Sequence, residues 1–193
     1  MLLATFIHMS ALAEPSVHSV EDAKALLNAG HYSEALPILQ KSAVSGSPEA
    51  ELYLGLMYQS GWGVAQDYTQ ALQWYEKSAA AKNSEAANEL GSFYQNGWGV
   101  VRDYAQACQW YRKSAAAGNA KSMNNLGVLY ENGWGVTQDY QQARVWFEKA
   151  VRTGDAAVNK GRVLLSLNGF GVSWSHRWGE KWALRRNSTG PSF

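Results

Sequence analysis

Cysteine and histidine are scarce in this chain. Its 193 residues include one cysteine, Cys108, and four histidines at His8, His18, His31 and His176. A single cysteine excludes a disulfide framework within one chain and a thiolate metal cluster. The histidines show no metal-ligand spacing, so we expect neither a metal site nor a cofactor.

Signatures of enzymes are missing as well. The sequence contains no Gly-x-Ser-x-Gly, no Ser-x-x-Lys, no His-Glu-x-x-His and no phosphate-binding loop. Cys108 occupies the repeat position of Leu72 and Arg144, which predicts a half-exposed helix site and an inert thiol. We therefore expect a protein that is not an enzyme.

No hydrophobic run is long enough to span a membrane. The apolar stretch Leu2–Leu12 is followed by Ala13 and Glu14, and Ala11-Leu12-Ala13 is typical of a signal-peptide cleavage site. No lysine or arginine precedes Lys24, so the usual basic start is missing. We expect residues 1–13 to be a signal peptide and the protein to be periplasmic or secreted. A cytoplasmic chain with an apolar start is the alternative.

Charge of one sign is not in excess, because 17 basic and 16 acidic residues give a net charge of +1. This balance gives no electrostatic case for nucleic-acid binding. Residues 174–193 nevertheless carry a net charge of +3, from Arg177, Lys181, Arg185 and Arg186 against Glu180. Three tryptophans share the four-residue step of these cations: Trp174, Trp178 and Trp182. The stretch predicts either a cap on the fold or a basic aromatic stripe for anionic lipid, nucleic acid or an acidic partner.

The chain repeats itself every 36 residues. Gly-Trp-Gly-Val begins at Gly61, Gly97 and Gly133, and the same step relates many other positions. A fixed period of this length indicates stacked helical units in a solenoid. Such arrays usually bind partners on a long surface, so the period favours a binding function over chemistry.

Each repeat predicts two helices. In the first, Ser47 is a favoured N-cap and Pro48 suits the first helical position, so we expect a helix over 48–59. The Gly-Trp-Gly-Val turn ends it, and Asp67 caps a second helix. A mid-helix glycine recurs at Gly55, Gly91 and Gly127, which indicates that a neighbouring helix comes too close for a side chain. The tryptophans of the second helix are predicted to pack in the core: Trp74, Trp110 and Trp146.

Partial copies lie at both ends. Residues 14–46 predict an N-terminal helix pair without the long glycine turn, ahead of three full copies at 47–82, 83–118 and 119–154. Residues 155–186 form a degenerate copy that suits a cap, and 187–193 a tail.

The repeat resembles the Sel-one-like repeat family, a longer-loop relative of tetratricopeptide repeats. The residues that carry the resemblance in the first copy are Ala50, Leu54, Gly55, Tyr58, Gly61, Gly63, Val64, Asp67, Tyr68, Ala71, Trp74, Tyr75, Lys77 and Ala79. The resemblance implies an all-α, right-handed superhelical solenoid and a scaffold or adaptor role, often in the bacterial envelope. It implies no catalytic residue. A cysteine-rich branch is tied to penicillin binding or hydrolysis, which the single cysteine disfavours here.

Two surfaces are candidate binding sites for a protein or peptide. The turn tryptophans Trp62, Trp98 and Trp134 form either a ladder of aromatic anchors or contacts that hold each turn against the next repeat. Three asparagines of the first helices suit a peptide backbone, unless they belong to an ordinary solvated face: Asn88, Asn124 and Asn125. We expect a non-catalytic interaction scaffold that binds on the concave face. The alternatives are an envelope enzyme or β-lactam-binding protein, and a peripheral membrane protein that uses the basic C-terminal stripe.

Overall fold

The protein is a row of helix pairs. The computed structural model describes residues 19–153, which form eight α-helices and no β-strand. The helices are α1 (Val20–Asn28), α2 (Tyr32–Val44), α3 (Pro48–Ser60), α4 (Tyr68–Ala80), α5 (Ser84–Asn96), α6 (Tyr104–Ala116), α7 (Ala120–Asn132) and α8 (Tyr140–Arg152). The prediction of an all-α solenoid is confirmed. The predicted signal peptide, fourth copy and tail lie outside the described residues.

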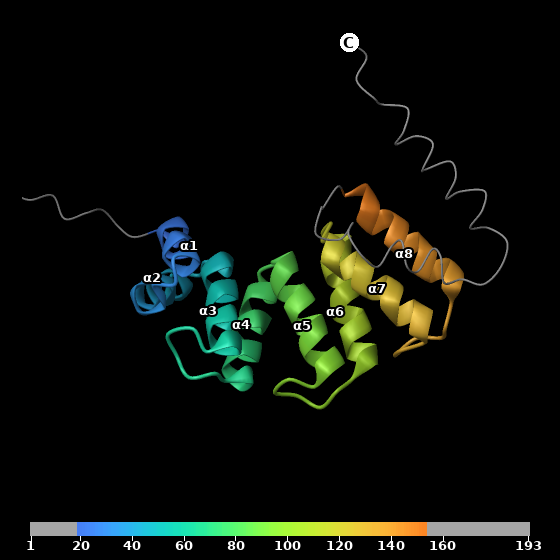
Figure 1. The fold of residues 1–193 in the computed structure, drawn as a ribbon, viewed down its shortest axis with the longest axis horizontal. Helices are drawn as coiled ribbons and strands as arrows, with labels where there is room; N and C mark the ends of the chain where they lie inside the picture. Colours follow the sequence, from blue (N-terminus) through green and yellow to red (C-terminus); the bar gives the residue numbers. More distant parts are fainter. Residues whose placement is uncertain (1–18, 154–193) are drawn as a thin grey trace, which may run out of the picture.

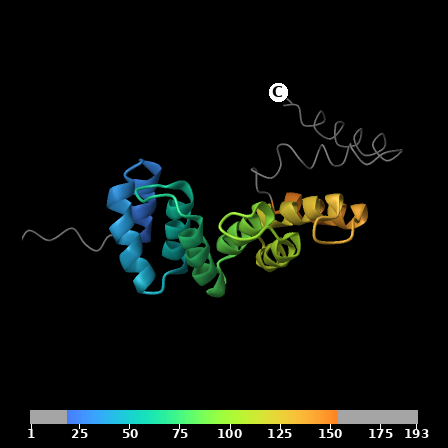
Figure 2. The same cartoon turned by 90° about the horizontal axis from the view of Figure 1, so that it is seen from below.

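The pairs follow one another in a curved row from α1–α2 to α7–α8 (Figure 1). Each helix packs on its partner in the pair and on the next helix along the chain. Seen from below, α7 and α8 are turned relative to α1 and α2, so the row twists as it grows (Figure 2). We call α3–α4, α5–α6 and α7–α8 repeats 1, 2 and 3.

The helices begin where the sequence predicts. The side chains of Ser47, Asn83 and Asn119 accept hydrogen bonds from backbone amides of the first turns of α3, α5 and α7. Asp67, Asp103 and Asp139 do the same for α4, α6 and α8. Each cap satisfies a donor that the helix itself leaves unpaired, which contributes about 1 kcal/mol.

The first helix of each repeat ends in a left-handed glycine. Gly61, Gly97 and Gly133 have φ of +71°, +74° and +69°, a conformation that costs other residues free energy. The end of the turn is tied back to the helix, because the amide of Asp67 donates to the Tyr58 carbonyl at 2.9 Å. Lys82 adopts φ of +66° where Gly46 and Gly118 stand in the neighbouring copies. The turn after repeat 1 is therefore strained.

The core of each repeat is an aromatic ring set against a glycine. A Cβ added to Gly55 would lie 2.5 Å from the Tyr75 ring, and one added to Gly127 would lie 2.5 Å from the Phe147 ring. Gly91 stands in the same relation to the Tyr111 ring. These rings are almost completely buried. The prediction that a neighbouring group approaches the mid-helix glycines too closely for a side chain is confirmed.

The core packing predicted for the second-helix tryptophans is confirmed in part, because all three pack against buried hydrophobic clusters without being buried themselves. Trp74, Trp110 and Trp146 are only half-buried, whereas the residue that follows each of them is the buried ring. The indoles lie at the rim, where the ammonium groups of Lys77, Lys113 and Lys149 sit 4.1, 4.0 and 4.2 Å from the ring centroids. Adjacent helix positions differ by about 100° in direction, so only one of two neighbouring aromatic residues can face the paired helix.

The contact of glycine with aromatic ring predicts the effect of a minimal substitution. Gly55→Ala should lower the free energy of unfolding by about 1–3 kcal/mol, because the new methyl group overlaps the Tyr75 ring. This loss should appear although alanine favours helix by about 1 kcal/mol over glycine. Urea unfolding of the variant measures it.

Gly46→Ala is the matched control, since nothing lies within 4 Å of its added methyl group and only its φ of +82° opposes it. A stabilised Gly55→Ala protein would contradict the packing.

Candidate partner-binding surface

Side chains of successive first helices meet directly. We call the surface formed by α1, α3, α5 and α7 the first-helix face. The Lys24 ammonium on α1 lies 2.9 Å from a Glu49 carboxylate oxygen on α3, and that of Lys121 on α7 lies 3.7 Å from a Glu85 oxygen on α5. Tyr53 on α3 is half-buried beside Lys24, whose ammonium is 5.9 Å from its ring centroid. The face therefore presents polar side chains that are bonded across helix boundaries.

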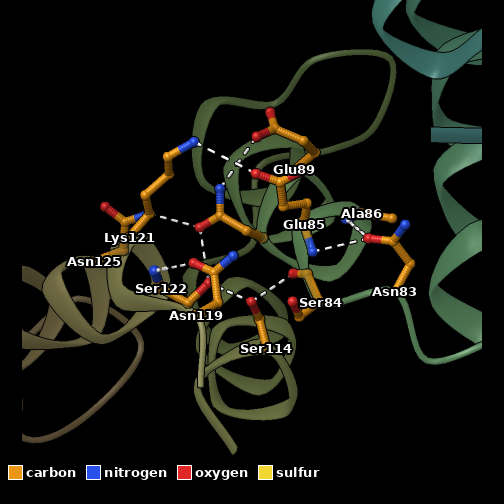
Figure 3. A network of polar contacts seen from close by, with 11 residues as sticks. Asn83, Ser84, Glu85, Ala86, Glu89, Ser114, Asn119, Lys121, Ser122 and Asn125 are labelled. Carbon is orange, nitrogen blue, oxygen red and sulfur yellow. Dashed lines mark hydrogen bonds and ion pairs between the residues drawn. The ribbon is translucent and has the colours of Figure 1, made fainter. Parts of the chain in front are cut away.

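A buried polar network lies beneath this face between α5 and α7 (Figure 3). Asn88 is at its centre, with 5% of its surface exposed. Its carbonyl oxygen lies 2.8 Å from the Ser122 hydroxyl and accepts from the Asn125 amide at 3.2 Å. Its own amide donates to Glu89 at 3.1 Å. Asn88 thus holds the side chains of Glu89 and Asn125 in place.

The network continues into the second helix of repeat 2. The Ser122 hydroxyl lies 2.6 Å from that of Ser114, which donates to the Ser84 carbonyl at 2.6 Å. Ser114 and Ser122 are both completely buried, including their hydroxyl groups. Buried hydroxyl groups are tolerated when they are hydrogen-bonded, and these bonds join α5, α6 and α7.

The corresponding position between repeats 1 and 2 is apolar. Leu52 stands 36 residues before Asn88, and Ala86 stands 36 residues before Ser122; both belong to one buried hydrophobic cluster. Within each repeat the serine bond is the same, since Ser78 donates to the Pro48 carbonyl at 2.6 Å as Ser114 does to that of Ser84. Across the first boundary, the Asn83 amide donates to the same Pro48 carbonyl at 3.5 Å. Both boundaries contain a buried apolar cluster, and they differ at this one position, where the first has apolar side chains and the second has hydrogen-bonded polar ones.

The three asparagines predicted to bind a partner differ in their burial and hydrogen bonding. Asn88 lies below the surface, where its amide is used within the protein, so it positions other groups rather than facing a partner. Asn125 is half-buried and bonded to Asn88. Asn124, at the repeat position of Asn88, is also half-buried, and its buried side-chain oxygen has no partner within residues 19–153.

Burial gives Glu89 an unusual carboxyl group. Loss of water raises its pKa above the ordinary glutamate value, while the bond from Asn88 and the charge of Lys121 act in the opposite direction. Burial is the largest cause, so the charged form of Glu89 is disfavoured on folding. The first-helix face contains a carboxyl whose protonation is coupled to stability.

Each turn tryptophan stacks on a tyrosine of the preceding pair. The Trp62 ring lies 5.3 Å from that of Tyr32, Trp98 lies 5.8 Å from Tyr68 and Trp134 lies 5.2 Å from Tyr104, each pair within 28° of parallel. The packing is toward the preceding repeat, whereas one of our two alternatives placed it against the next repeat. Trp62 and Trp134 remain 36% and 39% exposed, so one edge of each indole still reaches solvent.

Sequence reasoning missed Tyr53, Glu85, Ser114 and Ser122. For Ser122 a signal existed, because Asn88 and Ser122 both depart from the apolar residues found 36 positions earlier. Two departures on facing helices indicate a polar contact between repeats. Tyr53 and Glu85 carry no comparable signal.

The described residues include one cysteine, Cys108, whose thiol is buried. Cys108 is 2% exposed, so the half-exposed position that we predicted for it is wrong. Burial raises the pKa of its thiol, which lowers the fraction of reactive thiolate.

Within residues 19–153 no group of three or more His, Cys, Asp or Glu side chains is placed to hold a metal ion. The helices of this range are all too short or too polar to cross a bilayer.

Helix pairs repeated every 36 residues and joined by glycine turns define an α-solenoid repeat protein. The model of the Sel1 repeat matches residues 48–83, 84–119 and 120–155. The chain belongs to the Sel1 repeat family. Proteins of this family generally mediate protein–protein interactions and are generally non-catalytic. A comparison with curated proteins finds no significant match.

Solved structures show the same fold. A Sel1 repeat protein from Oxalobacter formigenes is 37% identical with a TM-score of 0.68, over 72% of this chain and 57% of that one. A protective antigen of uropathogenic Escherichia coli with an SLR fold, c5321, is 29% identical with a TM-score of 0.65, over 84% of this chain and 38% of that one. The chain thus spans about half the length of these relatives or less. Cysteine rich protein B of Helicobacter pylori, at 24% identity and a TM-score of 0.50 over 73% of this chain and 95% of that one, shares the fold.

The two kinds of repeat boundary predict a non-additive pair of substitutions. Asn88→Leu should lower the free energy of unfolding by about 1–3 kcal/mol, because Ser122, Asn125 and Glu89 lose a buried partner. Adding Ser122→Ala should recover at least half of that loss, since the pair then copies Leu52 and Ala86.

Denaturant unfolding of the two single variants and the double variant measures this coupling. Additive losses would show that the apolar boundary of repeat 1 cannot replace the polar one.

The Glu89 carboxyl predicts a pH dependence of stability. Between the ordinary glutamate pKa of about 4.3 and the raised folded value, the folded protein holds a proton that the unfolded chain has lost. The free energy of unfolding should therefore fall as pH rises through this window. Glu89→Gln should remove that fall.

Urea unfolding at a series of pH values from about 4 to 7 measures this fall in the free energy of unfolding. Glu34→Gln is the control, because it removes a carboxyl that is 64% exposed and does not act on Glu89. An unchanged pH slope in Glu89→Gln would contradict the assignment.

Proposed function

We propose that this protein is a non-catalytic interaction scaffold that binds a protein or peptide partner along the first-helix face, on the concave side of the array. The observation that carries the proposal is the set of polar side chains on consecutive first helices that are bonded across helix boundaries, including Lys24 to Glu49 and Asn125 to Asn88. A surface built from one helix position repeated along the array suits an extended partner.

The rigidity of this face supports binding. Asn88 is buried and bonded on three sides, so Glu89 and Asn125 are already ordered before a partner arrives. Ordering an interfacial side chain on binding costs about 0.5–1.5 kcal/mol, and a face that is ordered in advance avoids part of that cost. The face is thus better suited to recognition than a solvated helix surface.

We propose the bacterial cell envelope as the place of action. The apolar stretch Leu2–Leu12 and the small residues before Glu14 support export, and the solved relatives come from bacteria. Recovery of chains that begin at Glu14 from a periplasmic fraction would support this location. Full-length chains found only in the cytosol would overturn it.

Affinity capture from a bacterial envelope extract tests the binding surface. The wild-type chain is compared with Tyr53→Ala/Lys121→Ala, which alters the first-helix face. The control is Lys41→Ala/Gln73→Ala, which removes exposed side chains from the second helices. A third variant replaces all three turn tryptophans with alanine: Trp62, Trp98 and Trp134. Circular dichroism establishes that each variant is folded.

We expect the partner to be retained by the wild-type chain and the second-helix control and lost from the first-helix variant. Loss only from the tryptophan variant would move the binding site to the turns. Retention by all variants would remove the first-helix face from the proposal.

A further inference from the structure

The two layers of the array carry opposite charge, which the net charge of +1 conceals. The first helices, α1, α3, α5 and α7, contain seven carboxylates and two lysines, a formal net charge of −5. The second helices, α2, α4, α6 and α8, contain three carboxylates and seven basic side chains, a formal net charge of +4. The aspartates that cap three of the second helices, Asp67, Asp103 and Asp139, offset most of this positive charge, whereas the first helices have uncharged caps. A partner that approaches the first helices therefore meets an acidic surface.

At the α1 end of the first-helix face, the ammonium group of Lys24 is bound by acidic and aromatic side chains. The Lys24 ammonium lies 2.9 Å from oxygens of both Glu21 and Glu49. It also lies 5.9 Å from the centroid of the Tyr53 ring, at cation–π distance. Two carboxylates from different helices and an aromatic ring surround one ammonium group.

In the middle of the face, α3 and α5 each present a carboxylate that pairs with a lysine on its outer side only. Glu49, Glu85 and Lys121 occupy one helix position at steps of 36 residues, so two acidic residues follow each other before a basic one. Lys24 pairs with Glu49 and Lys121 with Glu85, at the two ends. Between α3 and α5, no ion pair joins the helices within residues 19–153. Tyr53 lies in this section, close enough to Glu49 and Glu85 for their charges to raise its pKa, although burial is the largest cause and Lys24 opposes it.

We propose that the section of the first-helix face between α3 and α5 binds a lysine or arginine side chain of an extended cationic partner segment, between Glu49 and Glu85 and beside Tyr53. This inference rests on the proposed function and names the chemistry of its partner. The partner cation completes the alternation of charge that Lys24 begins and Lys121 ends. Complementary charge also speeds encounter and makes binding sensitive to salt.

Two other occupants have a suitable charge and are distinguished by experiment. The chain's own residues 174–193 carry a net charge of +3, and the second helices of another copy carry +4 before their aspartate caps are counted. The second-helix layer carries its cations on packed helices rather than on an extended segment, and the tail is tested by a variant of its own. The external segment is therefore the occupant that we propose.

Fluorescence anisotropy with the full-length chain tests the proposal. The probe is a labelled short peptide of alternating lysine and serine, and a peptide of alternating glutamate and serine is its control. We expect the lysine peptide to bind and the glutamate peptide not to bind. Binding should weaken strongly at about 1 M salt, where the screening length is about 3 Å.

A matched pair of double variants locates the site. Glu49→Gln/Glu85→Gln should weaken binding of the lysine peptide about tenfold, or about threefold for each carboxylate. Glu34→Gln/Glu76→Gln removes the same charge from exposed positions of the second helices and should change the affinity less than twofold. Equal losses in the two variants, or no loss in the first, would overturn the proposal.

The remaining occupants each have their own outcome. A full-length chain with Arg177, Lys181, Arg185 and Arg186 changed to glutamine tests the tail, and binding seen only in this variant would show that the tail already covers the face. Salt-sensitive self-association in light scattering that Glu49→Gln/Glu85→Gln abolishes would identify a second copy. Either result would overturn an external cationic partner. Capture that depends on Tyr53 and Lys121 would still support the proposed function if the lysine peptide failed to bind.

Discussion

The contact between a helix glycine and an aromatic ring is the constraint on which the rest of the array depends. With no side chain at Gly55, the first helix of a repeat lies directly against Tyr75 of the second, and the same contact recurs at Gly91 and Gly127. Because this distance is the same in every pair, the turns of successive repeats fall into register. That register brings each turn tryptophan over a tyrosine of the preceding pair.

On this uniform framework the polar side chains vary from repeat to repeat. The hydroxyls of Tyr75 and Tyr111 donate to Gln59 and Gln95, and where Phe147 has no hydroxyl a glutamate, Glu131, replaces the glutamine. The boundary between repeats changes likewise, from Leu52 with Ala86 to Asn88 with Ser122. Backbone spacing is conserved along the array, and the chemistry of its surfaces is set locally.

The sequence predicted the framework better than the surface. A 36-residue period, capping residues and turn glycines are local signals, so helix bounds and the close glycine contacts were predicted. Which of two adjacent aromatic residues faces inward depends on the packing angle of the paired helix, and Trp74 was therefore chosen in place of Tyr75. Asn88 was predicted at the surface because a pattern within one repeat does not show Ser122 of the next. Contacts between repeats are the part that period alone leaves open.

The two kinds of repeat boundary give the array uneven mechanics. In a linear array each unit touches only its neighbours, so the coupling at each boundary governs how far unfolding spreads. Apolar contacts such as those of Leu52 weaken gradually as surfaces slide, whereas hydrogen bonds such as those of Asn88 are lost over a short displacement. A pull along the row therefore meets apolar contacts at both boundaries, and between repeats 2 and 3 it must in addition break hydrogen bonds that are lost over a short displacement.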